Sequence, residues 1–202
     1  ATRVFDADGR PAFTLYTEQR IEVPLSAVSP ALVAAVIAVE DQRFYRHYGF
    51  DLARIASAAL VNVREGRAAQ GGSTITQQLA RQSFLSPDKT FRRKLQELIL
   101  AARLERQFSK ARILELYLNK VYFGGGLYGV EAAARGYFGK SASTLSLGEA
   151  ALIAGLVKSP STYAPTVSPD RAMARRDLVL RAMRESGAVT EAEWRLARKE
   201  PV

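Results

Sequence analysis

Apolar residues recur at a spacing of three or four through most of the chain, which predicts amphipathic helices. The first helix is predicted from Pro30 to about Tyr48, with Ser29 as its cap and Gly49 beyond its end. Further helices are predicted at 51–64, from Thr74 onward, and at 87–108, 109–119, 130–138, 145–157, 170–185 and 190–199. Residues 4–13 instead predict two short strands that turn at Asp8-Gly9, and residues 14–28 look extended. The pattern is that of a mainly α fold with a short N-terminal β-hairpin.

Two acidic residues interrupt the apolar pattern of the first helix. With about 100° per residue, Glu40 lies about 80° from Leu32, inside the apolar arc, whereas Asp41 lies about 180° away, at its edge. Phe44 and His47 share the Glu40 face. Glu40 is therefore expected to be the trapped acid. Burial raises the pKa of a carboxyl group and prepares it for proton transfer, although a glutamate paired with His47 or a core cation would be purely structural.

A second acid, Glu97, falls within the helix predicted at 87–108. That helix carries two apolar faces, one with Phe91, Leu95, Leu98 and Ala102 and the other with Arg93, Glu97, Leu100 and Leu104. Both sides are therefore expected to be covered. Glu97 also follows Arg93 by four residues, so the alternative is a surface ion pair that contributes only about 0.3–0.5 kcal/mol.

The segment between the two acids combines a glycine loop, a helix start and several cations. In GGSTITQQLARQ (71–82), Thr74 and Gln77 fit a capping box, and free N–H groups at such a helix start bind phosphate readily. The cations that follow are Arg81, Lys89, Arg92, Arg93 and Lys94. The arrangement indicates transfer of a group from a phosphorylated leaving group. Alone, the glycine loop would indicate an ordinary helix cap.

The composition adds three constraints. The 202 residues carry a net charge of +9, which implies an anionic partner such as phosphate, acidic lipid or nucleic acid. With no Cys and one His, disulfides and thiolate metal sites are excluded, and any metal site must use oxygen ligands, which favours Mg²⁺ or Mn²⁺. The longest apolar run, residues 31–39, is too short to cross a bilayer, which takes about 20 residues. Because the chain starts at Ala1, we expect a fragment whose membrane anchor lies outside it.

Five segments, in this order, resemble the peptidoglycan glycosyltransferase domain of class A penicillin-binding proteins and monofunctional transglycosylases, glycosyltransferase family 51. They are EDQRFYRHYGFD (40–51), GGSTITQQL (71–79), RKLQE (93–97), KARILELYLN (110–119) and GVEAAARGYFGK (129–140). The resemblance implies one domain over residues 1–202 with a lysozyme-like, two-lobed helical fold. Within it, residues 1–28 form the hairpin and extended segment, about 50–72 a membrane-proximal jaw, and the remainder the head lobe.

The resemblance also implies an activity: polymerisation of lipid II into glycan strands by inverting glycosyl transfer, with release of undecaprenyl pyrophosphate. Glu40 matches the general base and Glu97 the second carboxylate, which would help to hold a divalent metal; no organic cofactor is implied. The matching substrate-binding positions are Asp41, Phe44, His47, Ser73, Thr74, Gln77, Gln78, Arg81, Lys89, Arg93, Lys94 and Asn119. Members of the family often have Lys where Arg81 stands and Arg where Lys89 stands. This exchange keeps both charges but not the bidentate phosphate geometry.

The partners implied are lipid II, the nascent glycan strand and a membrane surface, with moenomycin as an inhibitor and no nucleic acid. A transpeptidase domain would follow in a longer chain, at the extracytoplasmic face of the bacterial cytoplasmic membrane. Membrane docking is expected from an apolar stripe beside basic residues. The stripe is Leu52, Ile55, Leu60 and Val63, and the cations are Arg54, Arg64 and Arg67. Such a helix can lie among lipid headgroups, although the alternative is that it packs on the protein's own core.

Three other functions fit parts of the sequence. A lysozyme-like hydrolase would use a protonated Glu and water, but it gives no reason for the cations between the acids. A non-catalytic module that binds nucleic acid or membrane would use the +9 charge, but it does not explain an acid on an apolar face. A Ser/His/Asp hydrolase is weaker still, because His47 is the single histidine and the setting of Ser73 is that of a helix cap.

Overall fold

A computed structural model describes residues 2–6, 8, 11–15, 18–57, 72–86, 88 and 90–201. Its helices are α1 (Pro30–Glu40), α3 (Ile75–Phe84), α4 (Phe91–Gln107), α5 (Lys110–Lys120), α6 (Val130–Phe138), α7 (Leu147–Leu156), α8 (Pro160–Tyr163), α9 (Pro169–Glu185) and α10 (Glu191–Ala197). Shorter 3-10 helices are η1 (Leu25–Ala27), η2 (Phe44–Arg46) and η3 (Ala142–Thr144), and residues 52–57 are also helical. The prediction of a mainly α fold is confirmed.

The strands are short and lie at the N-terminal side of the helices. β1 (Thr2–Phe5) pairs antiparallel with β2 (Pro11–Leu15), so the predicted hairpin is confirmed. A second pair, β3 (Gln19–Arg20) with β4 (Leu127–Tyr128), is parallel and was not expected. It forms because the glycine-rich turn presents the Gly126 carbonyl to the Gln19 N–H at 2.8 Å. This pairing holds the start of the chain against the segment that leads into α6.

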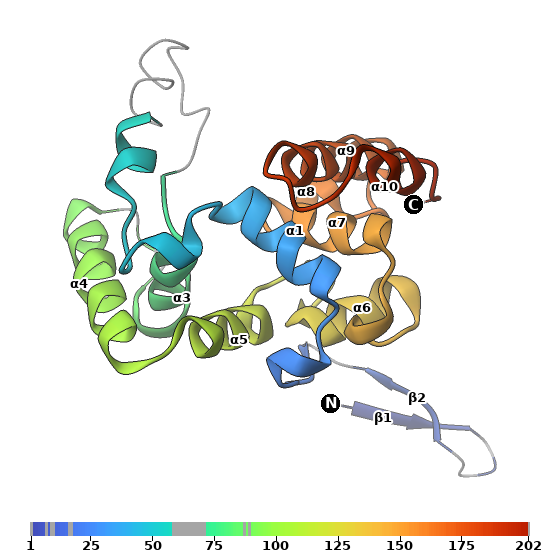
Figure 1. Cartoon of the computed structure of the whole chain (residues 1–202). Helices are drawn as coiled ribbons and strands as arrows, with labels where there is room; N and C mark the ends of the chain where they lie inside the picture. Colours follow the sequence, from blue (N-terminus) through green and yellow to red (C-terminus); the bar gives the residue numbers. More distant parts are fainter. Residues whose placement is uncertain are drawn as a thin grey trace.

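The helices form two groups with α1 between them (Figure 1). In one group α7 packs against α9 and α1, and in the other α3 packs against α4 and α5. The α7 sequence LGEAALIAGL is apolar on all sides, which is typical of a central helix, and most of its residues are buried. The C-terminal end of α1 points toward the α3 group (Figure 1). The end of α1 is therefore where the two groups meet.

The helix α1 is shorter than predicted, because it ends at Glu40 rather than near Tyr48. Asp41 leaves the helical region of backbone space (φ −161°, ψ 74°), and residues 44–46 form the separate turn η2. Gly49 then takes φ +93°, where a side chain is unfavourable, and a Cβ there would lie 3.0 Å from the Ala101 backbone. At the other end, Ser29 is the cap residue, but its hydroxyl donates to the Leu145 carbonyl rather than capping the helix.

The helix α4 also differs from its prediction. It begins at Phe91 rather than Pro87, because the Thr90 hydroxyl accepts the Arg93 N–H at 3.1 Å and so caps the helix there. One side of α4 is covered, with Glu97, Ala101 and Leu104 buried. The opposite side is open, with Phe91 at 90%, Leu95 at 54% and Ile99 at 47% of their surface exposed. The expectation that both faces are covered is wrong.

The other predicted helices within the described residues form within a few residues of their expected bounds, and the short helix α8 was missed. Of the helix predicted at 51–64, residues 52–57 are helical, and residues 58–64 lie outside the described residues. Among the described residues, no helix is long and apolar enough to cross a membrane.

Candidate active site

A buried carboxylate, that of Asp41, joins the end of α1 to the start of α3. Asp41 has no exposed surface, its Oδ2 accepts the Ile75 N–H at 3.0 Å, and His47 Nε2 lies 3.0 Å from both of its oxygens. Glu40 is only partly buried. The expectation that Glu40 is the trapped acid is therefore wrong. Because α1 ends at Glu40, the chain turns at the next residue and Asp41 points inward.

Arginine side chains compensate the negative end of α1. The Arg54 guanidinium donates to the Glu40 carbonyl and lies 3.8 Å from Asp41 Oδ1. A cation at this position is favourable, because the last carbonyls of a helix carry partial negative charge. Arg54 is itself held by Asp51, which accepts the Arg54 N–H at 2.9 Å and pairs with Arg43. Burial raises the pKa of Asp51, but the Arg54 N–H and the Arg43 guanidinium outweigh it and hold this pKa below its usual value.

The Glu40 side chain is held by residues from α3 and α5. Gln78 Nε2 donates to Glu40 Oε2 at 2.8 Å, and the Tyr117 hydroxyl donates to Gln78 Oε1 at 3.1 Å. Tyr117 has no exposed surface. Burial, together with the negative charge of Glu40, raises the pKa of Tyr117 well above its ordinary value, against the opposing charge of Arg81. Tyr117 therefore remains a hydrogen-bond donor at neutral pH.

A buried arginine on α9, Arg175, interacts electrostatically with Glu40. Its Nε donates to the Gly155 carbonyl at 3.1 Å, and a Cβ at Gly155 would lie 3.0 Å from Arg175 Cγ, so the glycine makes room for this side chain. Burial lowers the pKa of Arg175, and the charge of Glu40 opposes that shift. The sequence interpretation missed Arg175. The available signal was a cation on the apolar face of its helix, between Ala172 and Val179.

The second acid, Glu97, is surrounded by cations. It is only 1% exposed, with Oε2 2.8 Å from Lys94 Nζ and Oε1 3.2 Å from Arg93 Nε. Lys94 Nζ also lies 2.9 Å from Ser73 Oγ and 3.5 Å from Gln77 Oε1. The alternative of an exposed ion pair is wrong, because Glu97 is buried. Because Lys94 and Arg93 each carry a positive charge and Glu97 one negative charge, the cluster is positively charged overall, and it lies beside the 72–78 segment.

The first turn of α3 lies between the two acids. The predicted capping box is confirmed: the Thr74 hydroxyl accepts the Gln77 N–H, and the Gln77 side chain accepts the Thr74 N–H. The same hydroxyl donates to the Gly49 carbonyl at 2.7 Å. The N–H of Ile75 is taken by Asp41. Protein oxygens therefore accept three of the backbone donors at this helix start, the N–H groups of Thr74, Ile75 and Gln77, which the sequence interpretation expected to be free for phosphate.

The residues around Glu97 are a poor fit to a divalent cation. Both Glu97 oxygens face cationic nitrogens of Lys94 and Arg93, which would repel a metal ion. In the part of the chain that the structure describes, no group of three or more His, Cys, Asp and Glu side chains is arranged to hold one. We assign no step to a metal.

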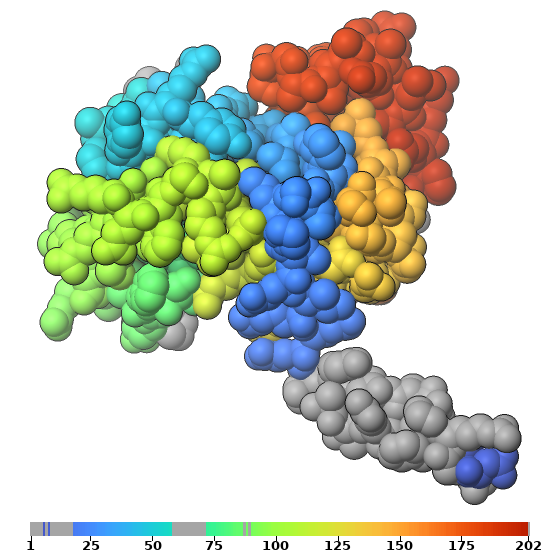
Figure 2. Space-filling view, turned by 60° about the horizontal axis from the view of Figure 1, so that its bottom comes forward, coloured from blue at the N-terminus to red at the C-terminus, as the bar shows by residue number. Residues whose placement is uncertain are grey.

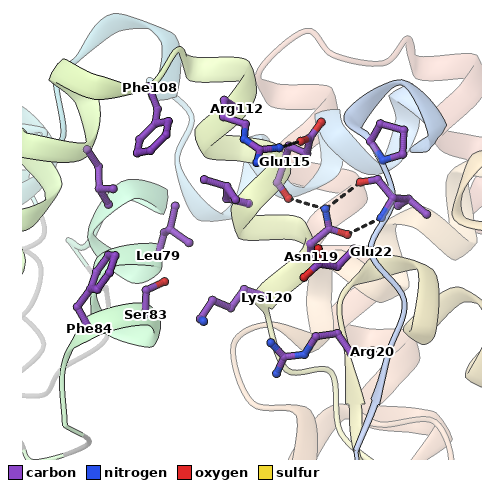
Figure 3. A pocket seen from close by; sticks show the side chains of 14 residues that line it. Arg20, Glu22, Leu79, Ser83, Phe84, Phe108, Arg112, Glu115, Asn119 and Lys120 are labelled. Atoms are coloured by element: carbon purple, nitrogen blue, oxygen red, sulfur yellow. Dashed lines mark hydrogen bonds and ion pairs between the residues drawn. The ribbon is translucent and has the colours of Figure 1, made fainter.

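Other predicted site residues lie away from the two acids. Phe44 has no exposed surface and packs in the core, with Lys110 Nζ 4.4 Å from its ring centre. Asn119 binds the Val23 backbone, accepting from its N–H at 3.0 Å and donating to its carbonyl at 2.8 Å. It lines a pocket of about 470 Å³ between α3 and α5 (Figure 3). Lys89 lies outside the described residues.

Comparison with known proteins identifies the family. The sequence matches the family described as Transglycosylase over residues 8–184. The chain belongs to the transglycosylase family. The similarity covers far more than the two acids, and it agrees with the family that the five motifs indicate.

Relatives of this transglycosylase domain are penicillin-binding proteins. Penicillin-binding protein 1A of Vibrio cholerae is 50% identical and that of Escherichia coli 48% identical, both over 200 residues, or 99% of this chain and 24% of each relative. Penicillin-binding protein 1A of Aquifex aeolicus is 47% identical over 202 residues, or 100% of this chain and 28% of the relative. The chain therefore spans only 24–28% of the length of these relatives.

A solved structure supports the fold assignment. The crystal structure of Penicillin-binding protein 1A from Haemophilus influenzae aligns with a TM-score of 0.60 and 28% identity, over 99% of this chain and 20% of that one. The lysozyme-like helical architecture expected from the motifs is confirmed.

The hydrogen bonds that Asp41 accepts between α1 and α3 predict an effect on stability. Asp41→Asn should lower the free energy of unfolding by about 3 kcal/mol, because the amide is uncharged and places an NH2 donor where one carboxylate oxygen now faces the His47 and Arg54 side chains. Urea unfolding followed by circular dichroism would measure the change. Asp88→Asn, at an exposed position, is the matched control and should change the value by less than about 0.5 kcal/mol. Equal midpoints for the two variants would contradict the proposed role of Asp41.

Proposed function

We propose that this transglycosylase domain polymerises lipid II into peptidoglycan glycan strands, with Glu40 as the general base. The observation that carries the proposal is the position of Glu40 at the end of α1, where it accepts from Gln78 and where its charge interacts with that of the buried cation Arg175. A carboxylate that accepts an amide N–H is favoured in its ionised form. That is the form in which it can remove a proton.

In the proposed reaction, Glu40 removes the proton from the 4-hydroxyl of the acceptor sugar. The hydroxyl oxygen forms a bond to C1 of the growing strand, and the bond from C1 to the pyrophosphate oxygen breaks. Undecaprenyl pyrophosphate leaves with the bonding electrons. A single displacement of this kind inverts the configuration at C1. General-base assistance of this kind contributes about 10²–10⁴-fold to the rate.

We propose that side-chain cations stabilise the negative charge of the leaving group. Asp41 and the capping box take up the N–H groups of Thr74, Ile75 and Gln77 at the α3 start, which leaves fewer backbone donors for a phosphate. Lys94 bridges Glu97 and Ser73, and we propose that Glu97 acts by holding this ammonium group toward the pyrophosphate. Arg81, one turn after Gln77 on α3, is a further proposed contact.

A lysozyme-like hydrolase is the second candidate. It needs a protonated glutamate that donates to the leaving oxygen. The Gln78 amide donates to Glu40, which favours a base rather than an acid at this position. The cations around Glu97 also fit a phosphorylated leaving group better than a sugar. By the same reasoning the phosphoglycolipid moenomycin is a proposed competitor, and a transpeptidase domain is proposed elsewhere in the full-length protein.

The two acids give the first functional prediction. Glu40→Gln should reduce the rate of lipid II consumption by about 10²–10⁴-fold without a change in melting temperature, because an amide cannot accept the proton. Glu97→Gln should be nearly as damaging, because it releases Lys94. The exposed Glu185→Gln on α9 is the control and should retain full activity. A folded Glu40→Gln protein with more than half of the wild-type rate would exclude Glu40 as the base.

A lipid-linked substrate also requires a membrane-facing surface, and we propose that α4 and the 52–57 helix provide it. The exposed apolar residues are Phe91, Leu95 and Ile99 on α4 and Leu52 and Ile55 on the shorter helix. Arg92, which is exposed, lies on α4 beside them. Apolar insertion together with attraction to anionic headgroups is typical of interfacial helices. Figure 2 shows both segments on the side of the molecule away from α9 and α10.

Part of the predicted docking stripe, Leu60 and Val63, lies outside the described residues, so the test moves to α4. Phe91→Ser combined with Leu95→Ser should lower partitioning onto anionic liposomes by about tenfold with little change in melting temperature. Leu178→Ser combined with Leu196→Ser removes similarly exposed residues from α9 and α10 and should leave partitioning unchanged. Equal loss in both double variants would contradict docking through α4.

A further inference from the structure

Three side chains from three helices form one hydrogen-bonded line that ends at Glu40. Tyr117 on α5 donates to Gln78 Oε1 at 3.1 Å, and Gln78 on α3 donates through Nε2 to Glu40 Oε2 at 2.8 Å. Tyr117 is fully buried and Gln78 is 8% exposed. Water has little access to the line, so each member depends on the next for its hydrogen bonds.

The direction of this line is set at the tyrosine end. A glutamine amide can turn over, so that either its N–H group or its carbonyl faces Glu40. The carbonyl would repel an ionised carboxylate and would bond only to a protonated one. With the amide turned over, the Tyr117 oxygen could accept an amide N–H, but its own buried proton would then have no acceptor among the described residues. Donation of this proton to the amide carbonyl therefore favours the orientation in which the N–H group faces Glu40. A phenylalanine in the same position would fill the same space but would leave the orientation of the amide open.

We propose that Tyr117 is a positioning residue for the general base: through Gln78 it keeps an N–H donor on Glu40, so that the carboxylate stays ionised and correctly aimed. This inference rests on the proposed role of Glu40. Tyr117 does not touch the reacting atoms. Its contribution is to select one of two amide orientations.

The other groups around Glu40 supply charge rather than orientation. The charge of Arg175 on α9 interacts with that of Glu40, Arg54 donates to the Glu40 carbonyl, and Asp41 lies next to Glu40 in the chain. The charge of Arg81 on α3 interacts with Tyr117. Among the described residues, none of these arginines hydrogen-bonds to the Gln78 side-chain amide, whose partners are Glu40 and Tyr117. Selection by Tyr117 is therefore separable from the electrostatics of the site.

The matched pair of variants is Tyr117→Phe and Tyr137→Phe. Tyr137 also donates its hydroxyl to one buried acceptor, the Phe123 carbonyl at 2.8 Å, but it does so away from Glu40. Tyr117→Phe should lower kcat by about tenfold with little change in KM, and should move the acid limb of the pH–rate profile to higher pH. Tyr137→Phe should change neither. Equal behaviour of the two variants would overturn the proposal.

A double-mutant cycle tests the route of the effect. If Tyr117 acts through Gln78, then Tyr117→Phe should have no further effect on kcat in a Gln78→Ala background. Multiplicative losses would overturn the proposal, because Tyr117 would then act by another path. A melting temperature lowered only in Tyr117→Phe, with kcat and the pH profile unchanged, would also overturn it in favour of a structural role.

A readout without substrate separates this inference from the proposed function. In protein with ¹³C-labelled glutamate, the Glu40 carboxyl signal can be assigned by its absence in Glu40→Gln and then followed through a pH titration. Tyr117→Phe should move the midpoint of this signal to higher pH, and Tyr137→Phe should not. If the midpoint moves while wild-type protein fails to consume lipid II, the positioning role stands and the proposed function falls. An unmoved midpoint would overturn the positioning role whatever the activity.

Discussion

A carboxylate with no exposed surface must receive its hydrogen bonds from inside the protein, and the arrangement around Asp41 follows from this constraint. Asp41 accepts from the first N–H of α3 and from His47, so the end of one helix is fixed to the start of another. The same turn leaves Glu40 as the last residue of α1, partly open and within reach of Gln78. Placement of the proposed base is thus a consequence of burying its neighbour.

The Asp41 contact also determines which groups remain for the substrate. A helix start would ordinarily attract an anion, and here a protein carboxylate takes that position. In the proposed reaction, side-chain cations then meet much of the charge of the pyrophosphate. Glu97 holds Lys94 toward Ser73 for this role, whereas Arg175, which donates to the Gly155 carbonyl, supplies positive charge that interacts with Glu40. Each of these cations is therefore held by a neighbouring residue.

Much of this arrangement was predictable from local sequence. Helical periodicity identified most helices, the Thr74–Gln77 capping box formed as expected, and the five ordered motifs were enough to indicate the family. The helical periodicity predicted the wrong buried acid, because it assumed that α1 continues beyond Glu40. The chain instead leaves the helix at Asp41, which accepts a long-range hydrogen bond from the Ile75 N–H. Arg175 and Tyr117 were missed for a related reason. Arg175 interacts with Glu40, and Tyr117 with Gln78, from distant parts of the chain, and no pattern within either helix shows these partners.

We propose that the domain transfers a glycan to a sugar hydroxyl rather than to water. The most direct test is to incubate wild-type protein with fluorescently labelled lipid II in detergent and to size the products before and after muramidase digestion. The account predicts a ladder of long strands that muramidase reduces to disaccharide units. Release of free single disaccharides with no polymer at any time point would instead show hydrolysis and would contradict the account.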